Sequence, residues 1–162
     1  MSTSHTVTLD TRSLANILDN LSEDNRRLAM LSALRAGGKV LQQNTKESLK
    51  KKLGSGATST SERNNKPMEQ GVRLIVDKDY NEVIVSIMKD YRLKWFEKGS
   101  DQRYLKKDHP KDGDHRKTYR KGEYRGHITA TNFFGEARQN DGPICDAIVA
   151  ELAEQINKLM KQ

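Results

Sequence analysis

The sequence has little cysteine and no long apolar run. Its 162 residues include one cysteine, which cannot form an intrachain disulfide and supplies at most one metal ligand. A disulfide-rich secreted scaffold and a cysteine zinc finger are therefore excluded. No stretch approaches the roughly 18 to 20 consecutive apolar residues that a transmembrane helix needs, so we expect no membrane contact. Residues 1–10 lack a basic segment followed by an apolar one, so we expect no secretory signal.

Charged residues, by contrast, are plentiful. They make up 31% of the chain, apolar residues make up 34%, and Lys and Arg outnumber Asp and Glu by 29 to 22. This composition and length predict one soluble domain of ordinary size, spanning residues 1–162. The net charge of +7 matters for binding only where it is concentrated.

Helical periodicity dominates the first third of the chain. Apolar residues three and four apart predict a helical arm within residues 1–21 and a longer helix that opens at Ser22. Gly37-Gly38 within the longer helix predicts a kink, a close helix crossing or a break into two helices, since each glycine costs about 1 kcal/mol in a helix interior. The expected apolar stripe of this helix is Leu28, Leu31, Leu34, Gly38, Leu41, Thr45, Leu49 and Leu53.

The middle of the chain changes to a period of two. Residues 54–70 contain only two apolar residues, and we predict a mobile polar loop there. Alternation over 72–77 and 83–88 predicts an antiparallel hairpin. Further extended pieces are expected at 91–96 and, with a weaker pattern, at 127–131.

A closing helix follows Pro143. Its apolar stripe predicts that the helix covers one face of the sheet, with Cys145 as an inert thiol on the buried side. The resulting fold class is α+β, with an antiparallel sheet of three or four strands packed by a long N-terminal helix and a C-terminal helix, and with a long basic loop. The stripe consists of Ile144, Ile148, Leu152, Ile156 and Leu159.

The long basic loop is an insertion over residues 101–126. Nine Lys or Arg residues lie against five acids from Asp101 to Arg125, so this stretch carries +4 of the total +7. Cations interleaved with three tyrosines can neutralise phosphates and stack on bases, which predicts a non-specific contact to DNA. The alternative is a solvated loop whose charge prevents aggregation. The candidate residues for contact with a polyanion or partner are Arg103, Lys106, Lys107, Arg116, Lys117, Arg120 and Lys121.

Catalytic chemistry finds little support. A metal-dependent nuclease using His109, His115 and Asp114 is an alternative, but their spacing fits no metal-ligand pattern and the neighbouring cations would repel the ion. No glycine-rich phosphate loop is present, and no acid–base pair stands out. We therefore expect no enzymatic activity, no metal and no cofactor.

Most of the aromatic residues lie in two short segments. We expect them to anchor the sheet to the helices, each burying a large apolar area, and exposed interface anchors are the alternative. A glycine after the first segment is expected to form a tight turn at a strand end. The expected structural anchors are Tyr91, Trp95, Phe96, Gly99, Phe133 and Phe134.

The order of these segments resembles the tail-component family of long-tailed bacteriophages. The resemblance covers roughly residues 25–160 and rests on three short motifs. Arg73 precedes Leu74 where that family has the reverse order, and other family positions are also substituted. The three motifs are Gly71-Val72-Arg73-Leu74, Tyr91 through Glu97-Lys98-Gly99-Ser100, and Asn132-Phe133-Phe134-Gly135-Glu136-Ala137.

Members of that family are tail-completion or neck proteins of the virion. The resemblance implies a structural protein of a phage or prophage that joins tail to head, is made in the bacterial host cytoplasm and ends in the virion neck or tail. It also implies a homo-oligomeric ring in contact with connector or tail-tube proteins, and no catalytic residues. The alternative is a small nucleic-acid-binding protein that acts through the basic loop 101–126.

Overall fold

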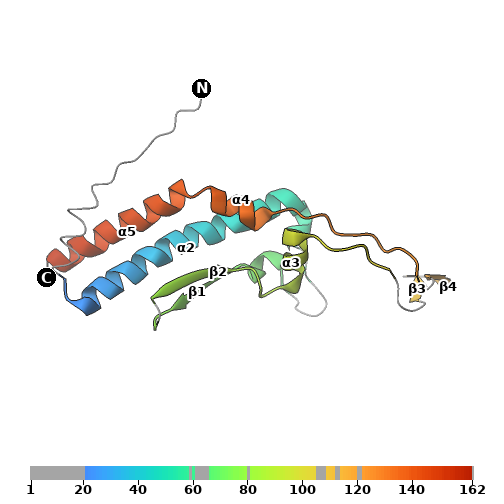
Figure 1. Cartoon of the computed structure of the whole chain (residues 1–162), viewed down its shortest axis with the longest axis horizontal. Helices are drawn as coiled ribbons and strands as arrows, with labels where there is room; N and C mark the ends of the chain where they lie inside the picture. Colours follow the sequence, from blue (N-terminus) through green and yellow to red (C-terminus); the bar gives the residue numbers. More distant parts are fainter. Residues whose placement is uncertain are drawn as a thin grey trace, which may run out of the picture. The chain divides into compact units, whose positions relative to one another are not determined.

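The computed structural model shows an α+β protein (Figure 1). It describes residues 21–58, 60, 66–79, 81–104, 109–111, 114–119 and 122–161, so the predicted arm 1–21 lies almost entirely outside the described residues. In chain order the elements are α2 (Glu23–Leu53), η1 (Gly54–Thr58), η2 (Met68–Gly71), β1 (Arg73–Asp77), β2 (Glu82–Ser86), α3 (Tyr91–Lys98), β3 (His109–Lys111), β4 (Asp114–Tyr119), α4 (Phe133–Gln139) and α5 (Gly142–Met160).

The long helix α2 is continuous over 31 residues. Acidic residues in its first turn and lysines in its last turn complement the helix dipole. Gly37-Gly38 does not break the helix, and Gly37 is buried. Of the three outcomes predicted for this pair, the close helix crossing is confirmed by the contacts of Gly37 described below.

The described chain divides into two compact units. Unit 1 contains the chain up to Val40, the segment Val76–Ile84 and the chain from Gly142 onward. Unit 2 contains Leu41–Ile75 and Val85–Asp141. Each unit is described by itself below.

Unit 1 pairs the first part of α2 with α5, which lie side by side (Figure 1). A Cβ added at Gly37 would lie 2.8 Å from Ile148 Cδ1 and 3.2 Å from the Ile144 carbonyl oxygen, so the α5 backbone passes close to α2 at this glycine. Ala29 and Ala33 lie on the same face of α2 at four-residue spacing and are both 2% exposed. Small residues therefore form the close contact face of α2.

The predicted stripe on α5 is confirmed, but α5 packs against α2, where a face of the sheet was predicted. The predicted stripe on α2 is partly wrong. Ile156 is 5% exposed, and the other stripe residues of α5 are half-buried. On α2, Leu49 and Thr45 are fully buried, but Leu28 is 66% exposed because the alanines occupy the buried face near the helix start.

Unit 2 holds the larger hydrophobic core. Residues from the two 3-10 helices contribute to it, so the segment predicted as a polar loop, 54–70, packs against the core at both ends. Leu53, Val85, Ile87, Phe96 and Phe134 pack around the core. The core itself consists of Leu49, Ala57, Met68, Val72, Leu93 and Phe133.

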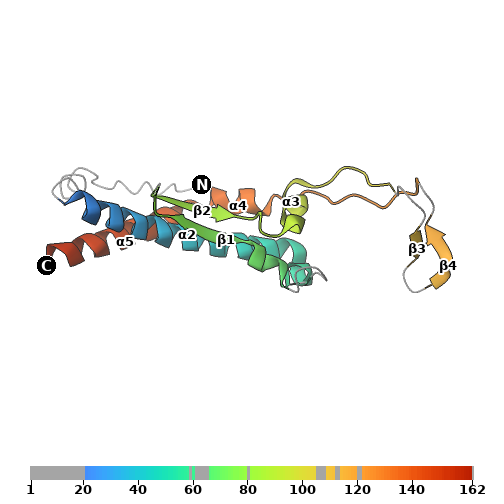
Figure 2. The ribbon, with the colours of Figure 1, turned by 90° about the horizontal axis from the view of Figure 1, so that it is seen from below.

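The predicted sheet of three or four strands is wrong for the described residues, which form two separate two-stranded sheets. The predicted hairpin is confirmed as β1 and β2, which lie side by side (Figure 2). The second sheet joins β3 to β4 within the basic insertion. Its antiparallel register pairs His109 with Tyr119 and Pro110 with Thr118, with an irregularity after Pro110.

The predicted strand at 91–96 is helix α3. The Asp90 carboxylate accepts a hydrogen bond from the Arg92 backbone N–H at 3.0 Å, which is the N-cap that starts the helix. Leu93 is its only fully buried residue. The glycine predicted at a strand end, Gly99, therefore ends a helix instead, and its φ of 77° is the left-handed conformation that glycine adopts readily.

The predicted strand at 127–131 is part of no sheet in the described chain. Its backbone pairs irregularly with the end of α3 and the chain that follows: the Ser100 N–H donates to the Ile128 carbonyl at 2.9 Å and the Thr131 N–H donates to the Phe96 carbonyl at 2.8 Å. Further out, the Arg125 N–H donates to the Arg103 carbonyl at 2.7 Å. The two ends of the basic insertion therefore run together as an antiparallel pair.

Candidate functional site

The structure describes only some of the predicted contact residues of the basic insertion. Arg103 is exposed where the two ends of the insertion pair. The backbones of Arg116 and Lys117 lie in β4. The other four candidates, Lys106, Lys107, Arg120 and Lys121, lie outside the described residues.

Two of the predicted aromatic anchors are surface residues instead. Tyr91 and Trp95 are 46% and 43% exposed, and their rings form an edge-to-face pair with centroids 5.1 Å apart. They are four residues apart and so share one face of α3, while Leu93 points into the core. Their exposure is greater than the predicted anchor role requires and agrees better with the alternative, exposed interface anchors.

The other predicted anchors contact either the core cluster or the backbone of the returning chain. Phe133 is fully buried, and Phe96 and Phe134 pack against the core cluster. Gly99 lies against the returning chain: a Cβ there would come within 2.9 Å of the Ile128 carbonyl oxygen and 3.0 Å of the Ala130 nitrogen.

A second aromatic pair lies where the ends of the insertion meet. Tyr104 and Tyr124 are 55% and 48% exposed, and their ring centroids are 5.6 Å apart. They face each other across an antiparallel backbone bridge. The Tyr124 hydroxyl lies 2.9 Å from His127 Nδ1, so this pair is linked to the chain that returns toward α4.

An open groove of about 570 Å³ lies between the end of α3 and the returning chain. We call it the Trp95 groove. One rim carries Lys98 and Asp101, and the opposite rim carries His127. Ser100 ties the rims together, because its hydroxyl oxygen accepts the Ile128 N–H at 2.9 Å. The full lining is Trp95, Lys98, Gly99, Ser100, Asp101, His127, Ile128, Thr129 and Ala130.

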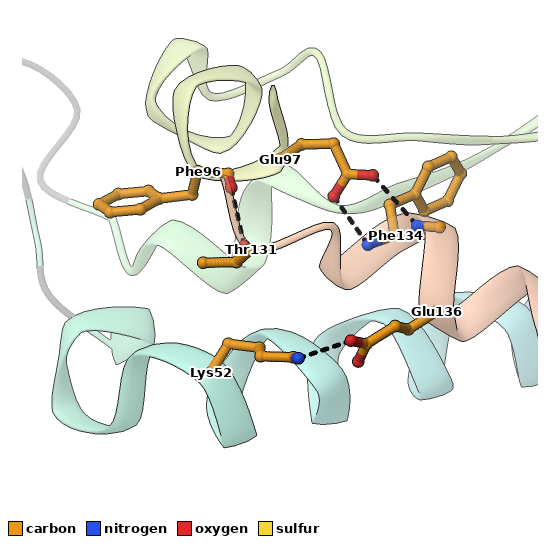
Figure 3. A network of polar contacts seen from close by, with 7 residues as sticks. Lys52, Phe96, Glu97, Thr131, Phe134 and Glu136 are labelled. Carbon is orange, nitrogen blue, oxygen red and sulfur yellow. Dashed lines mark hydrogen bonds and ion pairs between the residues drawn. The ribbon is translucent and has the colours of Figure 1, made fainter. Parts of the chain in front are cut away.

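Glu97, which precedes the groove residue Lys98 in the chain, joins α3 to α4 (Figure 3). Its carboxylate accepts the backbone N–H groups of Phe134 at 2.8 Å and Gly135 at 3.1 Å, in the first turn of α4. The Thr131 hydroxyl donates to the Phe96 carbonyl at 2.7 Å, beside these bonds. The end of α3 and the start of α4 are thus held together by direct hydrogen bonds.

The other end of α3 is fixed by an ion pair. Asp90 is 4% exposed, and its carboxylate accepts hydrogen bonds from the Arg92 guanidinium at 2.7 to 3.2 Å. Burial alone would raise the pKa of the Asp90 carboxyl, but the hydrogen bonds and charge of Arg92 outweigh it and hold that pKa below its ordinary value. The same hydrogen bonds raise the pKa of Arg92.

Cationic side chains also lie near the N-terminal end of α3. A cavity of about 210 Å³ is lined by the cations Lys66, Arg73 and Lys89, and the rest of its lining is Pro67, Gln70, Gly71 and Asp90. Asp90 is the acid in this lining, and its carboxylate is already paired with Arg92. The cavity is therefore lined by an excess of positive charge.

Sequence reasoning missed Lys98 and His127 as members of the Trp95 groove, and Lys89 as part of the cavity at the other end of α3. The local signal was present, because Asp90 before Tyr91 fits an N-cap and makes 91–98 a helix with Tyr91 and Trp95 on one face. The pairing of the two ends of the insertion, which brings His127 to the groove, is a long-range contact that no local pattern carries.

Metal and thiol chemistry gain no support in the part of the chain that is described. No group of three or more His, Cys, Asp or Glu there could hold a metal ion. The backbones of His109, His115 and Asp114 lie in β3 and β4, and their side chains are outside the description. Cys145, predicted on the buried side of α5, is exposed. Among the described helices, none combines the length and apolar character that crossing a membrane requires.

Comparison with known proteins finds no match: no protein-family model fits the sequence, and no curated protein or solved structure is similar to it.

Proposed function

We propose that the protein is a structural virion component of a phage or prophage, a tail-completion or neck protein that joins tail to head. The order of the described elements supports the proposal, because the long helix, the hairpin, α3 with Gly99, the insertion, α4 and the closing helix follow the order on which the resemblance rests. The proposal assigns no catalytic step to the chain.

The observation that carries the proposal is the large apolar surface. Among the described residues, ten large apolar or aromatic side chains are 41–67% exposed. The buried core of the same residues includes only six side chains larger than alanine. Such exposure is typical of a subunit that buries further surface against partners. The ten are Leu28, Met30, Ile75, Ile84, Met88, Tyr91, Trp95, Tyr104, Tyr124 and Met160.

The partners that this function requires are further copies of the chain, in a ring, and the connector or tail-tube proteins on either side. Exposed apolar residues occur in both units, for example Leu28 in unit 1 and Met88 in unit 2, both 66% exposed. A subunit within a ring needs at least two contact surfaces, one for each neighbour.

Deletion of the gene from the phage or prophage tests this function. We expect filled heads and separate tails in electron micrographs, and recovery of joined particles when the wild-type gene is supplied in trans. Leu28→Asp and Met88→Asp should fail to restore joining, because each places a charge on an apolar surface. Ser55→Asp, at an exposed polar position, should restore it. Joined, infectious particles without the gene would contradict the proposal.

A further inference from the structure

Two exposed aromatic pairs of unit 2 are each linked to a residue of the Trp95 groove. Trp95 lines the groove and contacts Tyr91, and the Tyr104–Tyr124 pair is linked to the groove residue His127 by the hydrogen bond between Tyr124 and His127. Four of the nine aromatic residues of the chain are thus half-exposed in or next to this groove, with Trp95 as the one in its lining. Several solvent-exposed aromatic rings in one region point to a ligand with flat apolar faces.

We propose that the Trp95 groove and its two aromatic pairs bind single-stranded nucleic acid. Bases stack on Trp95 and the neighbouring tyrosines, and phosphates lie against Lys98 and Arg103. This function goes beyond joining tail to head, and neither proposal depends on the other. It also differs from binding through the outer part of the basic loop, because the surface lies at the root of the insertion.

The charge around the groove favours a polyanion. Asp90 is paired with Arg92, and Glu97 accepts two backbone N–H groups of α4, so both acids are satisfied within the fold. The groove lining itself contains Lys98 and Asp101. The wider segments 89–104 and 122–131 add one more acid, Glu123, beside a larger set of cations. These cations are Lys89, Lys94, Lys98, Arg103 and Arg125.

Stacking faces favour a single strand over a duplex. In a duplex each base face is covered by its neighbours, whereas an unpaired base can stack on an aromatic side chain. The groove is open to solvent along its length, as binding of an extended strand requires. The cavity lined by Lys66, Arg73 and Lys89 provides additional positive charge at the other end of α3.

The groove contains its own reporter, because Trp95 is the only tryptophan of the chain. The full-length protein is titrated with an oligothymidylate of about 20 nucleotides, long enough to span several stacking positions. We expect quenching of the Trp95 fluorescence, and much weaker quenching by a duplex of the same length. No quenching at about 50 mM salt, or tighter binding of the duplex, would overturn the proposal.

Variants separate stacking from charge, with binding followed by anisotropy of a labelled oligothymidylate. Trp95→Ala should weaken binding by about 5- to 150-fold, the equivalent of one stacked base, and Trp95→Phe should retain most of the affinity. Lys98→Ala should reduce the slope of log affinity against log salt by about 0.7, the value for one phosphate of a single strand. Equal affinities of Trp95→Ala and wild type would overturn the stacking role.

Unit 1 supplies matched controls. Leu28→Ala removes an exposed apolar side chain and Arg35→Ala removes an exposed cation, and both residues belong to unit 1. Both controls should bind the oligothymidylate as the wild type does. If they weaken binding as much as Trp95→Ala and Lys98→Ala, binding is not located at the groove and the proposal fails.

Discussion

The Glu97 carboxylate accepts the backbone N–H of Phe134 at 2.8 Å and thereby joins the last turn of α3 to the first turn of α4. A second bond, from the Gly135 N–H, uses the other carboxylate oxygen. Because a helix start leaves its first N–H groups without partners inside the helix, this distant side chain supplies a cap that the local sequence does not. Asn132, at the N-cap position of α4, makes no capping hydrogen bond with its side chain.

Removal of this cap should destabilise the protein. Glu97→Ala leaves two N–H groups of α4 without their acceptor and should lower the free energy of unfolding by about 1–3 kcal/mol in urea titrations. Glu136→Ala is the matched control, because it removes a carboxylate whose ion pair with Lys52 is partly exposed, and it should cost less than about 1 kcal/mol. Equal losses in the two variants would contradict the capping role.

The close approach of α5 to α2 should make Gly37 intolerant of a side chain. Gly37→Ala gains about 1 kcal/mol of helix propensity, but the added methyl group meets Ile148, and overpacking costs about 1–3 kcal/mol. We expect net destabilisation in thermal unfolding. In the double variant with Ile148→Ala the two losses should fall short of additivity by at least about 0.5 kcal/mol. Strict additivity would show that the two side chains do not meet.

The Asp90–Arg92 pair should produce a defined pH dependence. The pKa of Asp90 is below its ordinary value in the folded protein, so its contribution is present above the unfolded pKa of about 3.9 and is lost as pH falls through the folded pKa. Asp90→Asn keeps a capping side chain but should cost about 3 kcal/mol at neutral pH. The stability difference between wild type and variant should shrink below about pH 4. A difference that stays constant from neutral pH to pH 2 would contradict this.

Phe133 and Trp95 should differ sharply in their contribution to stability. Phe133 is fully buried, so Phe133→Ala should cost about 3–5 kcal/mol in urea titrations. Trp95 is 43% exposed, and its alanine variant should lose about 1 kcal/mol, mainly the contact with Tyr91. A larger loss of unfolding free energy for Trp95→Ala than for Phe133→Ala would show that Trp95 is a structural anchor.

Local periodicity was enough to predict α2, the hairpin and α5. It failed at 91–96, where Tyr91, Trp95 and Phe96 suggested a strand because aromatic residues are common in strands, while Asp90 caps a helix. The apolar pattern also predicted that Leu28 lies on the buried face of α2, because leucine is more hydrophobic than alanine and dominates such a pattern. Ala29, Ala33 and Gly37 face inward because α5 passes close to Gly37, and this contact joins residues more than a hundred positions apart.

The candidate site was predictable only in part. The charge and tyrosines of the insertion pointed to the segment that contributes Arg103, Tyr104 and Tyr124 to the proposed site. The groove depends on backbone pairing between Ser100 and Ile128, which encloses an insertion of more than twenty residues. Such pairing follows from the tertiary structure around α3 and α4, so local patterns in the sequence do not reveal it.

The mass of the protein in solution tests the proposed assembly function most directly. Light scattering is measured on the purified chain alone and after mixing with the connector and tail-tube proteins of the same phage. We expect a mass that is a multiple of the 18.4 kDa chain, or a complex with at least one of these proteins, because the proposed assembly would bury the exposed apolar side chains of both units. A strict monomer, alone and in both mixtures, would contradict the account.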